Sequence, residues 1–84
     1  RPMNVQKIGE PIRVLARFGG GAIEPLRFRW GARTYVVDRV NARWTDRNAD
    51  GYSLHYSVQV GAETYYIHFS SVEVQWWIDE TVSD

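Results

Sequence analysis

The segment DRNADG, residues 46–51, matches the first half of a calcium-binding loop. Oxygen-bearing side chains at alternate positions can converge on a hard cation, and the glycine allows the sharp turn that such a loop needs. The twelfth position of the loop is Ser57, where a bidentate glutamate is normally required, and no helix is expected on either side. The same residue types also make ordinary turns. Asp46, Asn48 and Asp50 are therefore candidate metal ligands, with a plain turn as the alternative.

Two histidines, His55 and His68, occupy equivalent positions in two segments of alternating apolar and polar residues. Folding these segments back on each other at Gly61-Ala62 places the two imidazoles directly opposite, on the face away from the aliphatic side chains. Such a pair can share a metal ion or respond to pH. Zinc sites usually need three or four ligands, and no third ligand is evident nearby in the sequence. An ordinary surface pair is the alternative.

Arginines alternate with apolar residues in the first half of the chain, which predicts that they share the polar face of two neighbouring strands. They are Arg13, Arg17, Arg27 and Arg29. Tyr66 and the histidines are expected on the adjoining face. Arginines interleaved with aromatic rings are typical of surfaces that bind single-stranded nucleic acid. The alternative is a solvated face on which the aliphatic stems of the arginines cover the sheet.

The net charge is zero, but it is unevenly distributed along the chain. Residues 1–47 carry ten basic and four acidic side chains, whereas residues 48–84 carry six acidic side chains and neither Lys nor Arg. Either basic strands pair with acidic strands in the fold, or a basic patch meets an anionic partner. Neutrality of the whole chain argues against strong binding of nucleic acid.

Composition narrows the classes of function. The chain contains no cysteine, which excludes disulfides, thiol catalysis and cysteine-based zinc sites. It has no apolar run of about 20 residues and no secretory leader, so we expect a soluble cytoplasmic protein without a membrane partner. Arg1 at the start predicts a fragment or a trimmed form of the chain. No nucleophile motif and no clear pair of carboxylates is present, so neither an enzyme nor a cofactor is predicted.

The stretch Leu26–Trp44 organises the predicted fold. Its alternation predicts a strand, a two-residue Gly31-Ala32 turn of type II′ and a second strand. The expected partners are Trp30 with Arg33, Phe28 with Tyr35, and Leu26 with Val37. A second hairpin turns at Gly61-Ala62 and is expected to pair Val60 with Glu63, Val58 with Tyr65, Tyr56 with Ile67, and Leu54 with Phe69.

The remaining segments have less regular sequence patterns. A first strand is expected over Pro11–Phe18, followed by a flexible loop of three glycines; because a strand rather than a helix follows, this loop is not predicted to bind phosphate. The strand after Gly31-Ala32 changes phase, which predicts a bulge or bend near Asp38-Arg39 and burial of Val40, Ala42 and Trp44. The last strand is expected over Val74–Ile78.

These elements predict an all-β fold with five to six antiparallel strands in a meander, forming a small closed or half-open barrel. No segment has the 3.6-residue period of an amphipathic helix. We expect one domain over residues 1–84, with an ordered core of about residues 8–79. The ends, 1–10 and 79–84, are expected to be a partly ordered lead-in and a fraying tail.

One stretch resembles a family of small bacterial β-domains of unknown function. The residues that carry the resemblance follow the pattern P-x-x-F-x-W…R-x-Y-x-V…W, namely Pro25, Phe28, Trp30, Arg33, Tyr35, Val37 and Trp44. The segments 7–12 and 54–58 look similar as well, as do Tyr65-Tyr66 and Trp76, so the resemblance covers most of residues 7–77. Glycine directly after Trp30 departs from the pattern. The resemblance implies relatives that stand alone or are associated with DNA-repair polymerase-like proteins, and it implies no agreed activity.

The sequence therefore predicts a non-catalytic interaction module. Protein–protein contact or self-association is favoured because exposed rings such as Tyr66 and Trp77, together with the divided charge, suggest an adhesive patch. An open sheet edge would offer a second route to association. The alternative is weak binding of single-stranded nucleic acid through the arginines and Tyr66.

Overall fold

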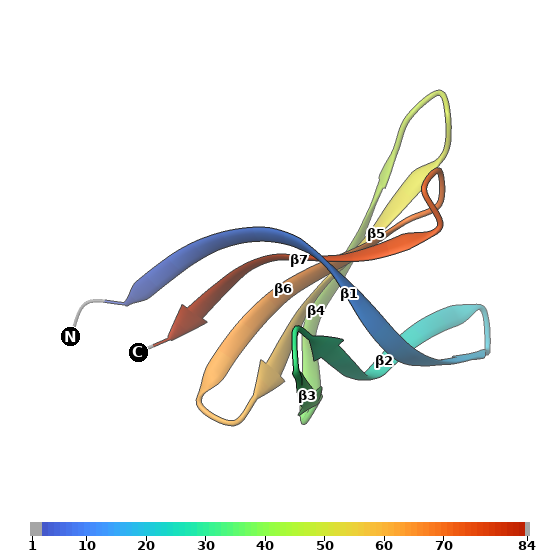
Figure 1. The fold of residues 1–84 in the computed structure, drawn as a ribbon. Coiled ribbons are helices and arrows are strands. Elements are labelled where there is room, and N and C mark those ends of the chain that lie inside the picture. Colours follow the sequence, from blue (N-terminus) through green and yellow to red (C-terminus); the bar gives the residue numbers. More distant parts are fainter. Residues whose placement is uncertain (1–2, 84) are drawn as a thin grey trace.

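The computed structural model describes residues 3–83, which form one antiparallel sheet of seven strands in the order β3-β2-β1-β7-β6-β5-β4. The strands are β1 (Asn4–Gly19), β2 (Ala22–Trp30), β3 (Arg33–Val36), β4 (Arg39–Arg47), β5 (Tyr52–Val60), β6 (Glu63–Ser70) and β7 (Gln75–Ser83). The sheet curls into a half-open barrel (Figure 1), which confirms the predicted class with one strand more than expected. No helix in the described residues has the length and apolar character needed to cross a membrane.

β1 is shared between two parts of the sheet. Its first half pairs with β7, from Asn4 opposite Ser83 to Ile12 opposite Trp76, and its second half pairs with β2. The predicted lead-in and tail are therefore wrong, because residues 4–10 and 79–83 are strands that pair largely with each other. These segments show no clear alternation of apolar and polar residues, because the pairing of β1 with β7 is irregular between Lys7 and Glu10. The start of β1 and the end of β7 therefore lie side by side (Figure 1).

The two Gly-Ala turns have the predicted geometry. Gly31 and Gly61 have φ angles of 62° and 60°, and the alanine after each has a negative φ, as a type II′ turn requires. The cross-strand partners expected from these turns are confirmed, including Phe28 with Tyr35 and Tyr56 with Ile67. The triple glycine forms a tight turn between β1 and β2 rather than a flexible loop, with Gly19 opposite Ala22.

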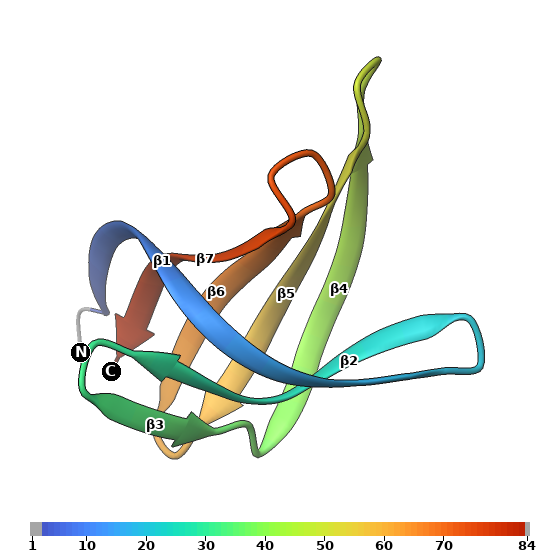
Figure 2. The same cartoon turned by 45° about the vertical axis from the view of Figure 1, so that its right-hand side comes forward.

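The chain crosses from one edge of the sheet to the other at the predicted bend. Val37 N donates to Leu26 O on β2, and Asp38 N donates to Gln59 O on β5. The predicted single strand is thus divided into β3 and β4, and the β3–β4 link holds one end of the barrel together (Figure 2).

The predicted burial in β4 is wrong for two of three residues. Val40 is half-buried, but Ala42 and Trp44 are exposed, Trp44 to 44%. The pairing with β5 is irregular between Val40 and Ala42, so an extra residue reverses the alternation. Arg43 rather than Trp44 is therefore the residue opposite the core side chain Tyr56.

The core is small and rich in aromatic rings. Its buried members are Ile12, Phe28, Tyr56, Val58, Tyr65, Ile67 and Ile78. Phe28 stacks on Tyr35 at 5.1 Å between ring centroids and meets Tyr65 edge-on at 5.4 Å. The Tyr56 hydroxyl donates to Ile23 O at 2.7 Å, which ties β5 to β2 across the barrel.

Tyr65 gives this core a dependence on alkaline pH. Burial, followed by the Glu63 carboxylate that accepts a hydrogen bond from the Tyr65 hydroxyl at 3.0 Å, raises the pKa of Tyr65 to about 12. An unfolded tyrosine ionises near pH 10, so between about pH 10 and 12 the folded state binds more protons than the unfolded state. The free energy of unfolding should therefore be fully retained below pH 10 and fall by roughly 2 kcal/mol as the pH rises to 12.

Denaturant unfolding at pH 9 and pH 11.5 measures this loss. The Tyr65→Phe variant should lose less stability between the two pH values than the parent chain, because its ring cannot ionise. Equal losses in both proteins would show that Tyr65 does not contribute.

Candidate functional site

Arginines gather on the outer face of β1 and β2. Arg13 lies directly opposite Arg29, and Arg27 lies opposite Leu15. On β3, Thr34 and Val36 extend the same two rows. We call the surface made by these six residues the arginine face; its members are Arg13, Leu15, Arg27, Arg29, Thr34 and Val36. A shallow groove of about 230 Å³ runs over it.

The charge on the arginine face is not neutralised by contact. Among the ion pairs within residues 3–83, none involves Arg13, Arg27 or Arg29. Like charges directly opposite each other destabilise a sheet, so the Arg13–Arg29 pair costs stability in the free protein. An anionic ligand placed between the two guanidinium groups would remove this repulsion.

The other two predicted residues, Arg17 and Tyr66, do not add unpaired groups to the arginine face. Arg17 is occupied by an ion pair with Glu24 on β2. Tyr66 lies on β6 between Ser57 and Glu80, two strands away from β1. Three of the five residues predicted to bind nucleic acid are therefore brought together, and the one predicted stacking ring is not among them.

Ion pairs between the basic first half and the acidic second half of the chain account for little of the uneven charge distribution. Within the described residues, one ion pair, Lys7 with Glu80 at 3.0 Å, joins a basic residue of the first half to an acid of the second half. On β1 and β2, Arg13 and Arg29 face each other, Arg27 lies opposite Leu15, and Arg17 pairs with Glu24. Arg13, Arg27 and Arg29 therefore have no ion-pair partner within residues 3–83.

The predicted calcium ligands are used differently in the structure. Asn48 Oδ1 accepts hydrogen bonds from Asp50 N at 3.0 Å and Gly51 N at 2.9 Å, which closes the turn between β4 and β5. Asp46 contacts His55 Nε2 at 3.2 Å. Because two of the three side chains already serve the turn and His55, the geometry favours the plain turn.

This turn should depend on Asn48. Asn48→Ala removes the acceptor of two backbone N–H groups, and we expect it to lower the free energy of unfolding by about 1–2 kcal/mol. Asp50→Ala, in the same turn, is the control and should change stability by less than about 0.5 kcal/mol. Chemical denaturation measures both, and equal effects would contradict the role of the Asn48 side chain.

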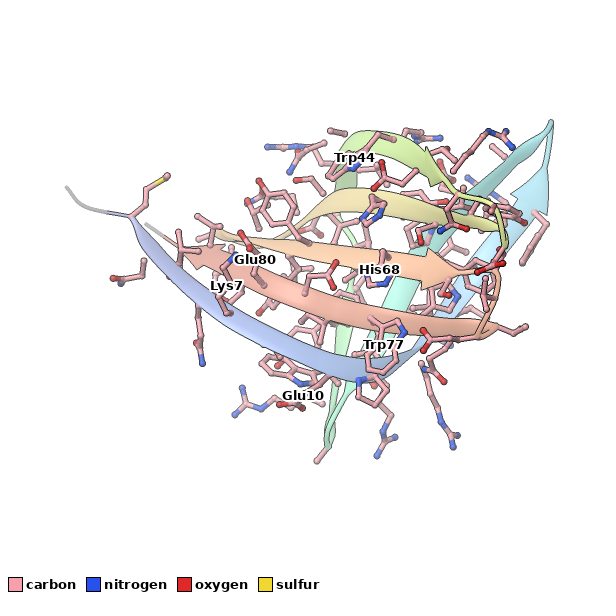
Figure 3. All side chains as sticks on the ribbon, turned by 90° about the horizontal axis from the view of Figure 1, so that it is seen from above. Lys7, Glu10, Trp44, His68, Trp77 and Glu80 are labelled. Carbon is pink, nitrogen blue, oxygen red and sulfur yellow. The ribbon has the colours of Figure 1, made fainter. Side chains whose placement is uncertain are left out.

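The predicted pairing of His55 with His68 is confirmed. The two imidazoles lie directly opposite each other on the outer face, with ring centroids 5.0 Å apart and planes 25° apart. Trp44 stacks on His55 at 5.4 Å and 7°, and Trp77 lies opposite His68. Figure 3 shows Trp44, His68 and Trp77 following one another across the strands.

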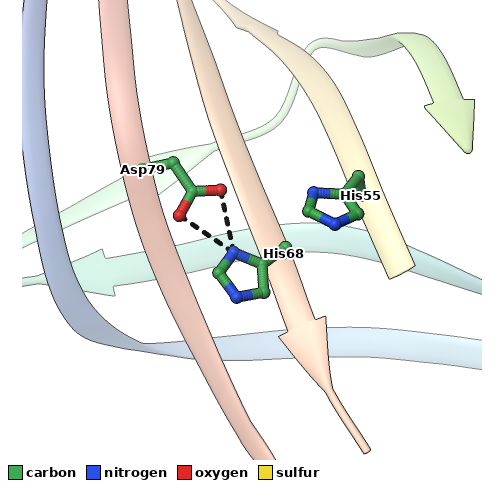
Figure 4. A group of neighbouring side chains, drawn as sticks. All are labelled: His55, His68 and Asp79. Carbon is green, nitrogen blue, oxygen red and sulfur yellow. Dashed lines mark hydrogen bonds and ion pairs between the residues drawn. The ribbon is translucent and has the colours of Figure 1, made fainter. Parts of the chain in front are cut away.

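Each histidine has its own carboxylate. His68 Nδ1 lies 2.8 and 2.9 Å from the two oxygens of Asp79 (Figure 4), while His55 Nε2 faces Asp46. Asp79 is an extra residue in β7, because Tyr66 pairs with Glu80 and the next residue of β6, Ile67, pairs with Ile78. Both histidine side chains are 21% exposed and Asp79 is 36% exposed, so the group is half-buried but open to solvent.

Sequence reasoning missed Asp79 and therefore found no third group beside the histidines. It assigned Asp79 to a fraying tail, and a pattern of strict alternation has no place for a bulge residue. The signal present in the sequence was the pair Asp79-Glu80, two adjacent acids directly after the apolar WWI segment.

The resemblance of Pro25–Trp44 to small bacterial β-domains stays a prediction. No protein-family model, no curated protein and no solved structure matches this chain.

Proposed function

We propose that this chain is a non-catalytic interaction module that binds an acidic, partly apolar segment of another protein on the arginine face. The observation that carries the proposal is the direct opposition of Arg13 and Arg29, neither of which forms an ion pair with a carboxylate of residues 3–83. A carboxylate on a bound segment would accept hydrogen bonds from both guanidinium groups and relieve their repulsion.

Apolar side chains on the same face favour a peptide over a simple polyanion. Leu15 is 52% exposed and Val36 is 60% exposed, and both lie in one row with Arg27. Large apolar side chains that are exposed together beside charged groups are typical of protein interfaces. A segment that alternates acidic and apolar residues would match both rows of the arginine face.

A second copy of the chain is a weaker fit than another protein. β4 is an edge strand of nine residues and is the longest open edge of the sheet. Antiparallel pairing of two β4 strands centred on Arg43 would place Arg39 opposite Arg47 of the other copy and Arg43 opposite itself. Like charges at these positions oppose self-association through this edge.

Binding of labelled peptides tests the proposal. A ten-residue peptide of alternating Glu and Leu should bind at 50 mM salt and weaken as salt is raised to 500 mM, because exposed charge–charge contacts are screened. Amide chemical shifts should move at Arg13, Leu15 and Arg29 and stay fixed on β5. Absence of binding at 50 mM salt would refute the proposal, and sedimentation of the chain over a range of concentrations tests self-association.

Single-stranded nucleic acid is the second candidate and is supported by the same uncompensated arginines. The arginine face carries no aromatic ring on which bases could stack, so binding would rest on phosphate contacts and fall steeply with salt. Titration of a labelled oligothymidine at 50 and 200 mM salt compares nucleic acid with the Glu-Leu peptide as a ligand. If the oligonucleotide binds more tightly than the Glu-Leu peptide at equal salt, nucleic acid becomes the favoured partner.

A further inference from the structure

We propose that His55, His68 and Asp79 form a binding site for a divalent late transition-metal ion, for which Zn²⁺ is the probe. One ring nitrogen of each histidine and one carboxylate oxygen of Asp79 all lie within 4.8 Å of one another. The three side chains come from neighbouring strands β5, β6 and β7 and converge at one point of the outer face (Figure 4). The site is separate from the arginine face.

The distances are close to those of a bound ion. Ligands about 2.0–2.1 Å from a tetrahedral Zn²⁺ lie roughly 3.4 Å from one another. His68 Nδ1 and the Asp79 oxygens are already within 2.9 Å, so an ion in place of the shared proton needs them to move apart slightly. A modest rotation of the His55 ring toward them would complete a set of three ligands and leave one position open to solvent.

The surroundings of His55 resemble the outer shell of a metal site. Ligating histidines almost always hydrogen-bond through their second nitrogen to a carboxylate or carbonyl, which fixes the ring orientation and raises ligand basicity. Asp46 lies 3.2 Å from His55 Nε2, which leaves Nδ1 of this ring for the ion. Trp44 stacks on the His55 ring with 5.4 Å between ring centroids.

The bulge in β7 is the strongest structural argument for the site. Since Ile67 and Tyr66 are consecutive, pairing of β6 with β7 would be regular if Asp79 were absent. The extra residue lets both Asp79 and its neighbour Glu80 reach the outer face, where they contact His68 and Lys7. Bulges often re-aim a side chain beside a functional site.

The ligand types select the class of ion. Two imidazoles and one carboxylate suit Zn²⁺ and neighbouring transition metals, whereas Ca²⁺ and Mg²⁺ prefer oxygen ligands throughout. Calcium in excess should therefore not displace zinc from this site.

Titration of the metal-stripped chain with ZnCl₂ tests the proposal. Calorimetry should give one equivalent of bound Zn²⁺, and the imidazole nitrogen resonances of both His55 and His68 should shift. Asp79→Asn should weaken binding at least about tenfold, and Asp46→Asn should weaken it by a similar factor through His55. Glu80→Gln changes the adjacent carboxylate on the same strand and should leave the affinity unchanged.

Two results would overturn the site. The first is the absence of both heat and imidazole shifts in the parent chain with excess Zn²⁺, a measurement that does not depend on whether any variant folds. The second is equal affinity of the parent chain and a folded Asp79→Asn variant, which would mean that the histidines alone hold the ion.

Discussion

Exchange of both Arg13 and Arg29 for glutamate is expected to weaken binding of the acidic peptide by about 100- to 1000-fold. The variant loses two charge-assisted hydrogen bonds to the peptide, each contributing about 1.5–3 kcal/mol, and each 1.4 kcal/mol is a tenfold change. The two glutamates would add repulsion toward the carboxylates of the peptide. Fold stability should change little, because one like-charged pair replaces another at the same cross-strand position. Fluorescence anisotropy at 50 mM salt measures the change.

The control for this variant carries the same change of net charge elsewhere. Arg39→Glu with Arg47→Glu alters β4, which is separated from β2 by four strands in the order of the sheet. It should reduce affinity by no more than a few fold, because only long-range attraction is lost. A loss as large as that of the Arg13 and Arg29 variant would show that binding follows overall charge rather than the arginine face.

Phe28→Ala is expected to have the largest effect on stability, with a loss of about 3–5 kcal/mol. The Phe28 ring is 1% exposed and contacts both Tyr35 and Tyr65, so its removal leaves a cavity that rigid neighbouring rings fill poorly. Small domains have about 5–15 kcal/mol of stability in total, and a chain of this size lies near the lower end. The variant should therefore be largely unfolded in mild denaturant.

Phe18→Ala is the matched control. Phe18 is 72% exposed near the tip of the β1–β2 hairpin, so the same substitution should change the free energy of unfolding by less than about 0.5 kcal/mol. Urea unfolding followed by tryptophan fluorescence compares the two variants. Similar losses at the two positions would contradict the placement of the core around Phe28.

The predictable parts of the fold are those in which local signals agree. In the β5–β6 hairpin, the Gly61-Ala62 turn and the alternation of apolar residues require the same register, and every expected pair is present. His55 and His68 follow from that register. Three of the predicted arginines also come together, since alternation places them on one face of β1 and β2.

The parts that failed depend on bulges and on distant pairing. One extra residue near Asn41 moves Trp44 from the predicted core to the outer face, where it stacks on His55. Asp79 is misplaced for the same kind of reason. The pairing of Asn4 with Ser83 joins the two ends of the described chain, and no local pattern in either segment indicates its partner.

The pairing of Asn4 with Ser83 has a mechanical consequence. Because Asn4 lies opposite Ser83, tension applied at these two residues pulls β1 and β7 apart sideways, along the direction of their hydrogen bonds. The hydrogen bonds between β1 and β7 then break one after another. In shear loading along the strands, by contrast, all of these bonds carry the load together. The domain should give way at low force, starting from β1 and β7, while the β5–β6 hairpin is still intact.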